Sequence, residues 1–136
     1  MNDAPAKVGM LDTSVLIAAG EGRPLRSEAL PERTAISIVT VSELRAGVLA
    51  APDTQSRDRR LATLERVSKA VVFPVDQRVA AAWAGMRAYL AASGERVSAN
   101  DLWIAATAAA NLMPVVTQDH HFSALSGVNG LTIVEV

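Results

Sequence analysis

The chain contains no cysteine among its 136 residues. This absence excludes disulfide bonds, thiolate nucleophiles and zinc sites built on cysteine. The sequence also lacks any apolar run close to the roughly 20 residues that a membrane-spanning helix needs. It shows no N-terminal signal pattern of basic residues followed by apolar ones. We therefore expect a cytoplasmic protein.

The chain has no excess of positive charge either, because it contains 13 basic and 14 acidic residues and its formal net charge is −1. Proteins that bind nucleic acid usually carry a positive excess, so the composition argues mildly against such a partner. Only Lys7 and Lys69 are lysines, and the other basic residues are arginines. The forked guanidinium group of arginine is a better ligand for phosphate than the ammonium group of lysine. The positions of the charges therefore matter more than their sum.

Half of the residues are hydrophobic, which predicts a packed core. We expect one domain over residues 1–136, with residues 1–6 disordered. Short apolar or β-branched runs predict strands at residues 8–11, 34–40, 71–75, 114–117 and 132–136. Helical patterns separate most of these runs, and residues 23–33 are expected to form a loop with at most a short helix. Continuously apolar strands that alternate with helices indicate an α/β three-layer sandwich with a central, mostly parallel sheet.

Residues that cap helices punctuate this pattern. A helix is predicted over residues 15–19, after Asp12, and others are predicted to end near Pro52, Ser93 and Asn111. The expected caps of the four later helices are, in order, Thr40 or Ser42, Asp53 or Thr54, Asp76, and Ser98 or Asn100.

Four of the fourteen acidic residues lie beside apolar elements that ought to be buried. Asp12 follows the first predicted strand, and Glu43 lies in the first turn of the helix after the second. Asp101 opens a strongly apolar helix, and Asp119 comes two residues after the fourth strand. In open parallel sheets, ligands bind beyond the carboxyl ends of the strands, so we expect these side chains to meet there.

Carboxylates gathered in this way repel one another, and a divalent cation relieves the repulsion. A site of oxygen ligands selects a hard ion, so Mg²⁺ or Mn²⁺ is favoured over zinc. Helix capping remains an alternative explanation for Asp12 and Asp101, and an interaction with the helix dipole remains one for Glu43. The spacing alone does not decide between these interpretations.

The residues around the four acids are more specific. In order along the chain they read Leu11-Asp12-Thr13-Ser14-Val15-Leu16, Ser42-Glu43-Leu44-Arg45-Ala46-Gly47, Asn100-Asp101-Leu102-Trp103-Ile104-Ala105-Ala106-Thr107-Ala108 and Thr117-Gln118-Asp119-His120-His121-Phe122. Together these motifs resemble the PIN-domain family, and within it the VapC toxins of bacterial type II toxin–antitoxin systems. The resemblance extends from Val8 to Val136.

The resemblance implies a PIN-like fold and a metal-dependent endoribonuclease that cleaves structured RNA, either transfer RNA or ribosomal RNA. It implies catalytic and metal-binding roles for Asp12, Glu43, Asp101 and Asp119, with Mg²⁺ or Mn²⁺ as the cofactor. Supporting hydroxyl groups are expected from Thr117 and from Thr13 or Ser14. The implied partners are RNA, a VapB-like antitoxin and a second copy of the chain or a toxin–antitoxin hetero-oligomer. Many relatives have asparagine where Asp119 stands and an acid near His121.

Other residues have two interpretations. Arg45 is predicted to contact RNA phosphate. The arginines at 57, 59 and 60 fit an RNA-binding stretch, although a solvated helix face is the simpler explanation. Trp83 and Trp103 are expected in packing contacts rather than base stacking, and His120 and His121 in an exposed loop.

Two other classes of protein share part of this pattern. An aspartate after the first strand also occurs in phosphatases and receiver domains of α/β fold. Ser14 replaces the second aspartate of those phosphatases, and no lysine follows Lys69 to serve a receiver. A catalytically inactive PIN-like binding module is the remaining alternative.

Overall fold

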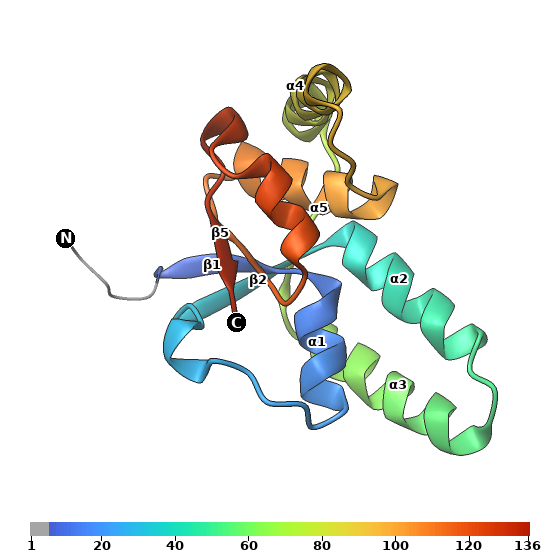
Figure 1. Ribbon diagram of the computed structural model, residues 1–136. Helices are drawn as coiled ribbons and strands as arrows, with labels where there is room; N and C mark the ends of the chain where they lie inside the picture. Colours follow the sequence, from blue (N-terminus) through green and yellow to red (C-terminus); the bar gives the residue numbers. More distant parts are fainter. Residues whose placement is uncertain (1–5) are drawn as a thin grey trace.

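A computed structural model describes residues 6–136, so most of the segment expected to be disordered lies outside the described residues. Five strands form one sheet in the order β3-β2-β1-β4-β5, and all four strand pairs are parallel. Their bounds are β1 (Val8–Leu11), β2 (Arg33–Ser37), β3 (Val71–Phe73), β4 (Val115–Thr117) and β5 (Ile133–Glu135). The predicted α/β class with a parallel sheet is confirmed (Figure 1).

The α-helices are α1 (Thr13–Gly20), α2 (Ile38–Leu49), α3 (Thr54–Val67), α4 (Gln77–Ser93) and α5 (Ala99–Ala110). Three short 3₁₀ helices, η1 (Ser27–Ala29), η2 (His120–Leu125) and η3 (Val128–Gly130), complete the chain. The helix η1 confirms that residues 23–33 carry at most a short helix. Across residues 6–136 the longest apolar helical stretch falls short of what a membrane crossing requires.

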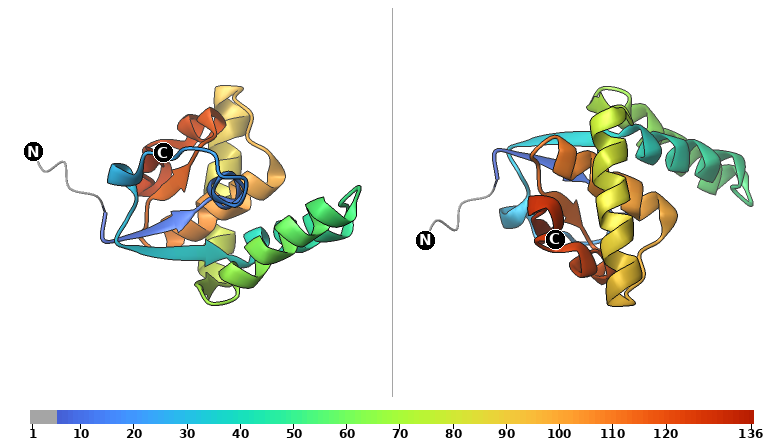
Figure 2. Two further views of the ribbon diagram at one scale, coloured as in Figure 1. Left: turned by 90° about the horizontal axis from the view of Figure 1, so that it is seen from below. Right: turned by 90° about the horizontal axis from the view of Figure 1, so that it is seen from above.

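Neighbouring residues of each central strand point to opposite faces of the sheet. Met10 and Val115 face a large cluster formed with α4, α5 and η2. Leu11 and Val116 face a smaller cluster with α1, and Ile36 packs with residues of α2 and α3. The sheet is therefore covered on both faces, while α2 and α3 form a hairpin that extends away from it (Figure 2).

Trp83 on α4 and Trp103 on α5 stack against each other, with ring centroids 4.9 Å apart and planes inclined by 16°. Both rings are partly buried. This contact confirms that the two tryptophans serve helix packing.

The second strand is shorter than predicted. It ends at Ser37, and the β-branched residues from Ile38 to Val41 begin α2 instead. The buried residues Thr40, Leu44 and Val48 recur every four positions, so helical burial overrides the local preference for strand. The cap of α2 is therefore Ser37, whose hydroxyl accepts a hydrogen bond from Val39 N at 3.1 Å, and the prediction of Thr40 or Ser42 was wrong.

The remaining caps follow the sequence closely. Asp53, Asp76 and Ser98 each accept a bond from a backbone N–H of the first turn of the next helix. Asp12 precedes α1, but its side chain makes no capping bond. The carboxylate of Asp12 is therefore free of the capping role that the alternative interpretation gave it.

We predict that Ser37→Ala lowers the free energy of unfolding by about 1 kcal/mol, because it removes the hydroxyl that caps α2. Ser42→Ala is the matched control, since the Ser42 hydroxyl is exposed and only donates to Ile38 O within the same helix. Urea denaturation monitored by circular dichroism measures both. Equal losses in the two variants would contradict the assignment of the cap.

Candidate active site

The four acids come to one edge of the sheet, at the carboxyl ends of β1, β2 and β4. Asp12 directly follows β1, and Asp119 lies two residues after β4. Asp101 is the third residue of α5. Glu43 is in the second turn of α2 rather than the first, because that helix begins at Ile38. The structure thus brings together the acids that the sequence singled out.

Asp12 is buried, and two hydroxyl groups hold its carboxylate. Ser14 Oγ donates to Asp12 Oδ2 at 2.7 Å, and Thr117 Oγ1 donates to the same oxygen at 2.9 Å. No other side-chain hydrogen bond to this carboxylate is formed within residues 6–136. The second oxygen, Oδ1, is therefore available to a ligand.

The same hydroxyl groups also fix the backbone around the site. Thr117 Oγ1 accepts from Asp119 N at 2.9 Å, and Ser14 Oγ accepts from Gln118 N at 3.1 Å. The loop after β4 is thereby tied to the beginning of α1. Ser14 and Gln118, which lie 104 positions apart in the chain, are thus joined by a hydrogen bond.

Glu43 is held by Thr13. Its Oε1 accepts a bond from Thr13 Oγ1 at 2.7 Å, and the buried Thr40 Oγ1 lies 3.1 Å from the same hydroxyl. The expectation that Thr13 or Ser14 supports Asp12 therefore resolves into two contacts, because Ser14 binds Asp12 and Thr13 binds Glu43. The sequence singled out Thr40 only as a possible helix cap and not as a residue of the site, and its four-residue spacing from Leu44 is the signal that places it on the buried face of α2.

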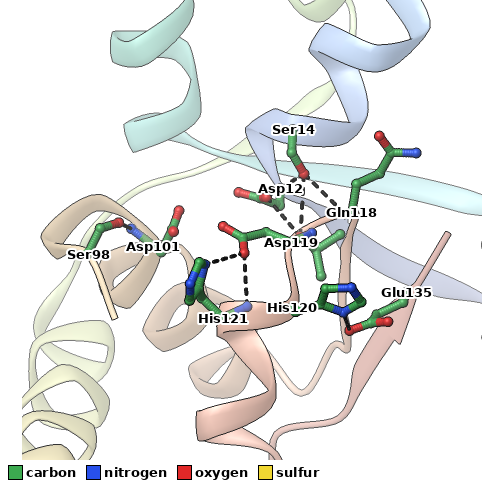
Figure 3. A network of polar contacts seen from close by, with 10 residues as sticks. Asp12, Ser14, Ser98, Asp101, Gln118, Asp119, His120, His121 and Glu135 are labelled. Atoms are coloured by element: carbon green, nitrogen blue, oxygen red, sulfur yellow. Dashed lines mark hydrogen bonds and ion pairs between the residues drawn. The ribbon is translucent and has the colours of Figure 1, made fainter. Parts of the chain in front are cut away.

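His121 orients the side chain of Asp119. Its Oδ1 accepts from His121 N at 2.9 Å and lies 2.7 Å from His121 Nδ1. Figure 3 shows the carboxylates of Asp12, Asp101 and Asp119 facing a common space, with the His121 ring beside Asp119. Both histidines are exposed, as expected. His120 Nδ1 lies 3.0 Å from Glu135 Oε1, so this histidine contacts an acid outside the group of four.

The pKa of Asp101 is raised from 3.8 to about 6, mainly by burial and next by the carboxylate of Asp12. Asp119 and Glu43 make smaller contributions to this rise, and a hydrogen bond with Ser98 opposes it. The electrostatic influence of all three acids on Asp101 shows that the four charges share one region. Their repulsion is the kind that a divalent cation relieves.

The donor set suits a hard cation, because all four groups are carboxylates and cysteine is absent. Within residues 6–136, no three acidic or histidine side chains lie close enough together to hold one ion as they stand. Direct binding of one ion by three or more of these carboxylates would therefore require the side chains to rotate toward each other. Asp12 and Glu43 are tethered at one oxygen each, which leaves the other oxygen of each for the ion.

Arg45 is exposed on α2. It lines neither of the two hollows that flank Glu43, so its predicted contact with phosphate stays a prediction. Two other arginines, Arg59 and Arg60, do line one of these hollows. Both side chains are also exposed, as the interpretation of a solvated helix face predicts.

Comparison with known proteins agrees with this geometry. The PIN domain profile matches residues 9–128. The chain is 51% identical to "Ribonuclease VapC5" of Mycobacterium tuberculosis over 136 residues, which is 100% of both chains. It is 36% identical to "Ribonuclease VapC4" of the same organism over 91% of this chain and 95% of the relative.

A solved structure, described as a member of the VapBC family of toxin–antitoxin systems, VapBC-5, from Mycobacterium tuberculosis, superposes with a TM-score of 0.90 and 49% identity. The match covers 96% of this chain and 99% of that one. The fold and the acidic edge therefore define a PIN domain. The chain belongs to the PIN-domain family and, within it, to the VapC group.

We predict that Asp101→Asn stabilises the metal-free protein at pH 7.5. A carboxyl group whose pKa is raised on folding contributes stability below its unfolded pKa of 3.8 and loses that contribution as the pH rises through about 6. After a discount for solvent screening, removal of this charge should raise the free energy of unfolding by roughly 1 kcal/mol and Tm by about 3 °C.

Thermal unfolding in a chelator at pH 7.5 and pH 4.5 measures this difference. The gain should shrink at the lower pH, where Asp101 in the folded wild type is already protonated. A variant less stable than the wild type at pH 7.5, or an equal gain at both pH values, would contradict the raised pKa of Asp101.

Proposed function

We propose that this protein is a divalent-metal-dependent endoribonuclease that acts as the toxin of a toxin–antitoxin pair. The observation that carries the proposal is the cluster of four carboxylates whose charges act on Asp101. The full-length identity of 51% to a protein named as a ribonuclease supports RNA as the substrate.

The proposed reaction is hydrolysis of a phosphodiester bond. When bound, Mg²⁺ or Mn²⁺ would supply a water of lowered pKa and would neutralise the charge that develops on the phosphate. The residues that would hold the ion are Asp12, Glu43, Asp101 and Asp119. Ser14, Thr13 and Thr117 keep these acids in place through the bonds described above.

The proton of the attacking water passes to Glu43 or Asp101. The water oxygen bonds to phosphorus as the bond to the 3′-oxygen breaks, and that oxygen takes up a proton. The products carry a 5′-phosphate and a 3′-hydroxyl.

The proposed partners follow from the relatives. The structure matched at a TM-score of 0.90 is described as part of the VapBC family of toxin–antitoxin systems, which supports a VapB-like antitoxin for this chain. A homodimer or a toxin–antitoxin hetero-oligomer is the proposed assembly. The substrate is a structured RNA, either transfer RNA or ribosomal RNA, and the proposed location is the cytoplasm, where both occur.

We expect the purified protein to cleave a pool of transfer and ribosomal RNA in Mg²⁺ or Mn²⁺, and a chelator to stop the cleavage. Asp101→Asn should lower the rate by at least a hundredfold, because it removes a charged ligand of the ion. Asp58→Asn is the matched control, since Asp58 is an exposed acid on α3 outside the cluster. Gel electrophoresis and end-mapping of the products give the rate and the chemistry of the new termini.

A different pair of results would favour the alternative of an inactive PIN-like binding module. These results are the absence of cleavage in every RNA fraction and the absence of thermal stabilisation by Mn²⁺. Cleavage that survives in Asp101→Asn at the wild-type rate would remove the carboxylate cluster from the mechanism.

A further inference from the structure

A hollow of about 290 Å³ lies between α1, α2 and α3, and the catalytic candidate Glu43 forms part of its wall. Two arginines from α3, Arg59 and Arg60, line the same hollow. We call it the arginine hollow. Its other lining residues are Ile17, Gly20, Glu21, Leu44, Gly47 and Thr63.

Both arginines line the hollow, and Arg60 is held there by a hydrogen bond that leaves its charge without a carboxylate partner. Arg60 Nη1 donates to Gly47 O at 2.7 Å, which draws the side chain across to α2. Within residues 6–136, neither Arg59 nor Arg60 forms an ion pair. The hydrogen bond from Ser56 N is the main cause that lowers the pKa of Asp53, and the two arginines add to this effect from a greater distance.

Other charges near the hollow are already engaged. Glu21 pairs with Arg23 at 3.0 Å, and Glu43 accepts the bond from Thr13. Arg59 and Arg60 are thus cationic groups without a partner carboxylate, in the same hollow as an acid of the candidate site.

An RNA strand needs such groups here. The candidate site gathers four carboxylates, and the chain as a whole carries a formal charge of −1, so both repel a polyanion. The hollow on the other side of Glu43 is lined by Val39, Ser42, Glu43, Ala46 and Asn100 and offers no positive charge. The arginine hollow therefore offers compensating charge beside Glu43 to a strand that enters the site.

We propose that the arginine hollow binds a backbone phosphate of the RNA next to the scissile phosphate, with Arg59 and Arg60 as its ligands. Guanidinium groups match phosphate in charge and geometry. The partly exposed Ile17 offers an apolar surface to the adjoining ribose. This inference rests on the proposed function, because it places a neighbouring nucleotide relative to Glu43.

The test compares Arg59→Gln, Arg60→Gln and the double variant with Arg57→Gln. Arg57 is the matched control, because it is an exposed arginine on the same helix that does not line the hollow. With an RNA that the wild type cleaves, each single variant should raise KM roughly three- to tenfold at 0.1 M salt and leave kcat within about twofold. Arg57→Gln should match the wild type.

Salt dependence separates phosphate binding from a structural effect. The slope of log(kcat/KM) against log[salt] should become shallower by about 0.7 for each phosphate contact that is lost from a single strand. Equilibrium binding of the same labelled RNA in a chelator should show the same change in slope without any cleavage. Thermal unfolding of each variant checks that the fold is intact.

Equal salt slopes for Arg59→Gln, Arg60→Gln, Arg57→Gln and the wild type would overturn the inference. If the wild type still cleaved RNA in Mg²⁺, the proposed function would stand while this site failed. The inference would also be overturned if the double variant bound poly-glutamate more weakly than the wild type but bound RNA with the same affinity. That result would assign the hollow to an acidic polypeptide.

Discussion

Mutual repulsion among four carboxylates at one sheet edge is the constraint on which the rest of this structure depends. Parallel strands deliver Asp12 and Asp119 to the same edge, and the turns of α2 and α5 bring Glu43 and Asp101 beside them. Hydroxyl groups of Ser14, Thr117 and Thr13 then hold two of these acids by one oxygen each. Burial, and after it the charges of the other three acids, raise the pKa of Asp101, and the proposed divalent cation would neutralise this shared negative charge.

The sequence predicts the order and type of the elements because its strands are short, apolar and separated by helical patterns. It fails where two signals compete, as at residues 38–41, where β-branched side chains favour a strand but the four-residue spacing of Thr40, Leu44 and Val48 requires a helix. The caps Asp53, Asp76 and Ser98 were predictable, because their side chains bind backbone N–H groups only a few residues away. The 3₁₀ helices η2 and η3 have no comparable periodic signal.

For the site, the positions of the acids beside buried elements and the motifs around them lead to Asp12, Glu43, Asp101 and Asp119. Local patterns do not give the partners of these acids, because the bond from Thr117 to Asp12 joins residues from distant parts of the chain. The difference between Ser14, which holds Asp12, and Thr13, which holds Glu43, depends on the direction in which adjacent side chains leave α1. The arginine hollow could not be predicted from the sequence either, since it depends on how α3 packs against α2.

Calorimetric titration of Mn²⁺ into the metal-free protein at pH 7.5 tests the central claim most directly, with Asp12→Asn as the comparison. If the carboxylates form one metal centre, the wild type should bind Mn²⁺ in a saturable manner, and the variant should lose at least tenfold in affinity. Binding of the same strength in both proteins, or no saturable binding in the wild type, would contradict the account.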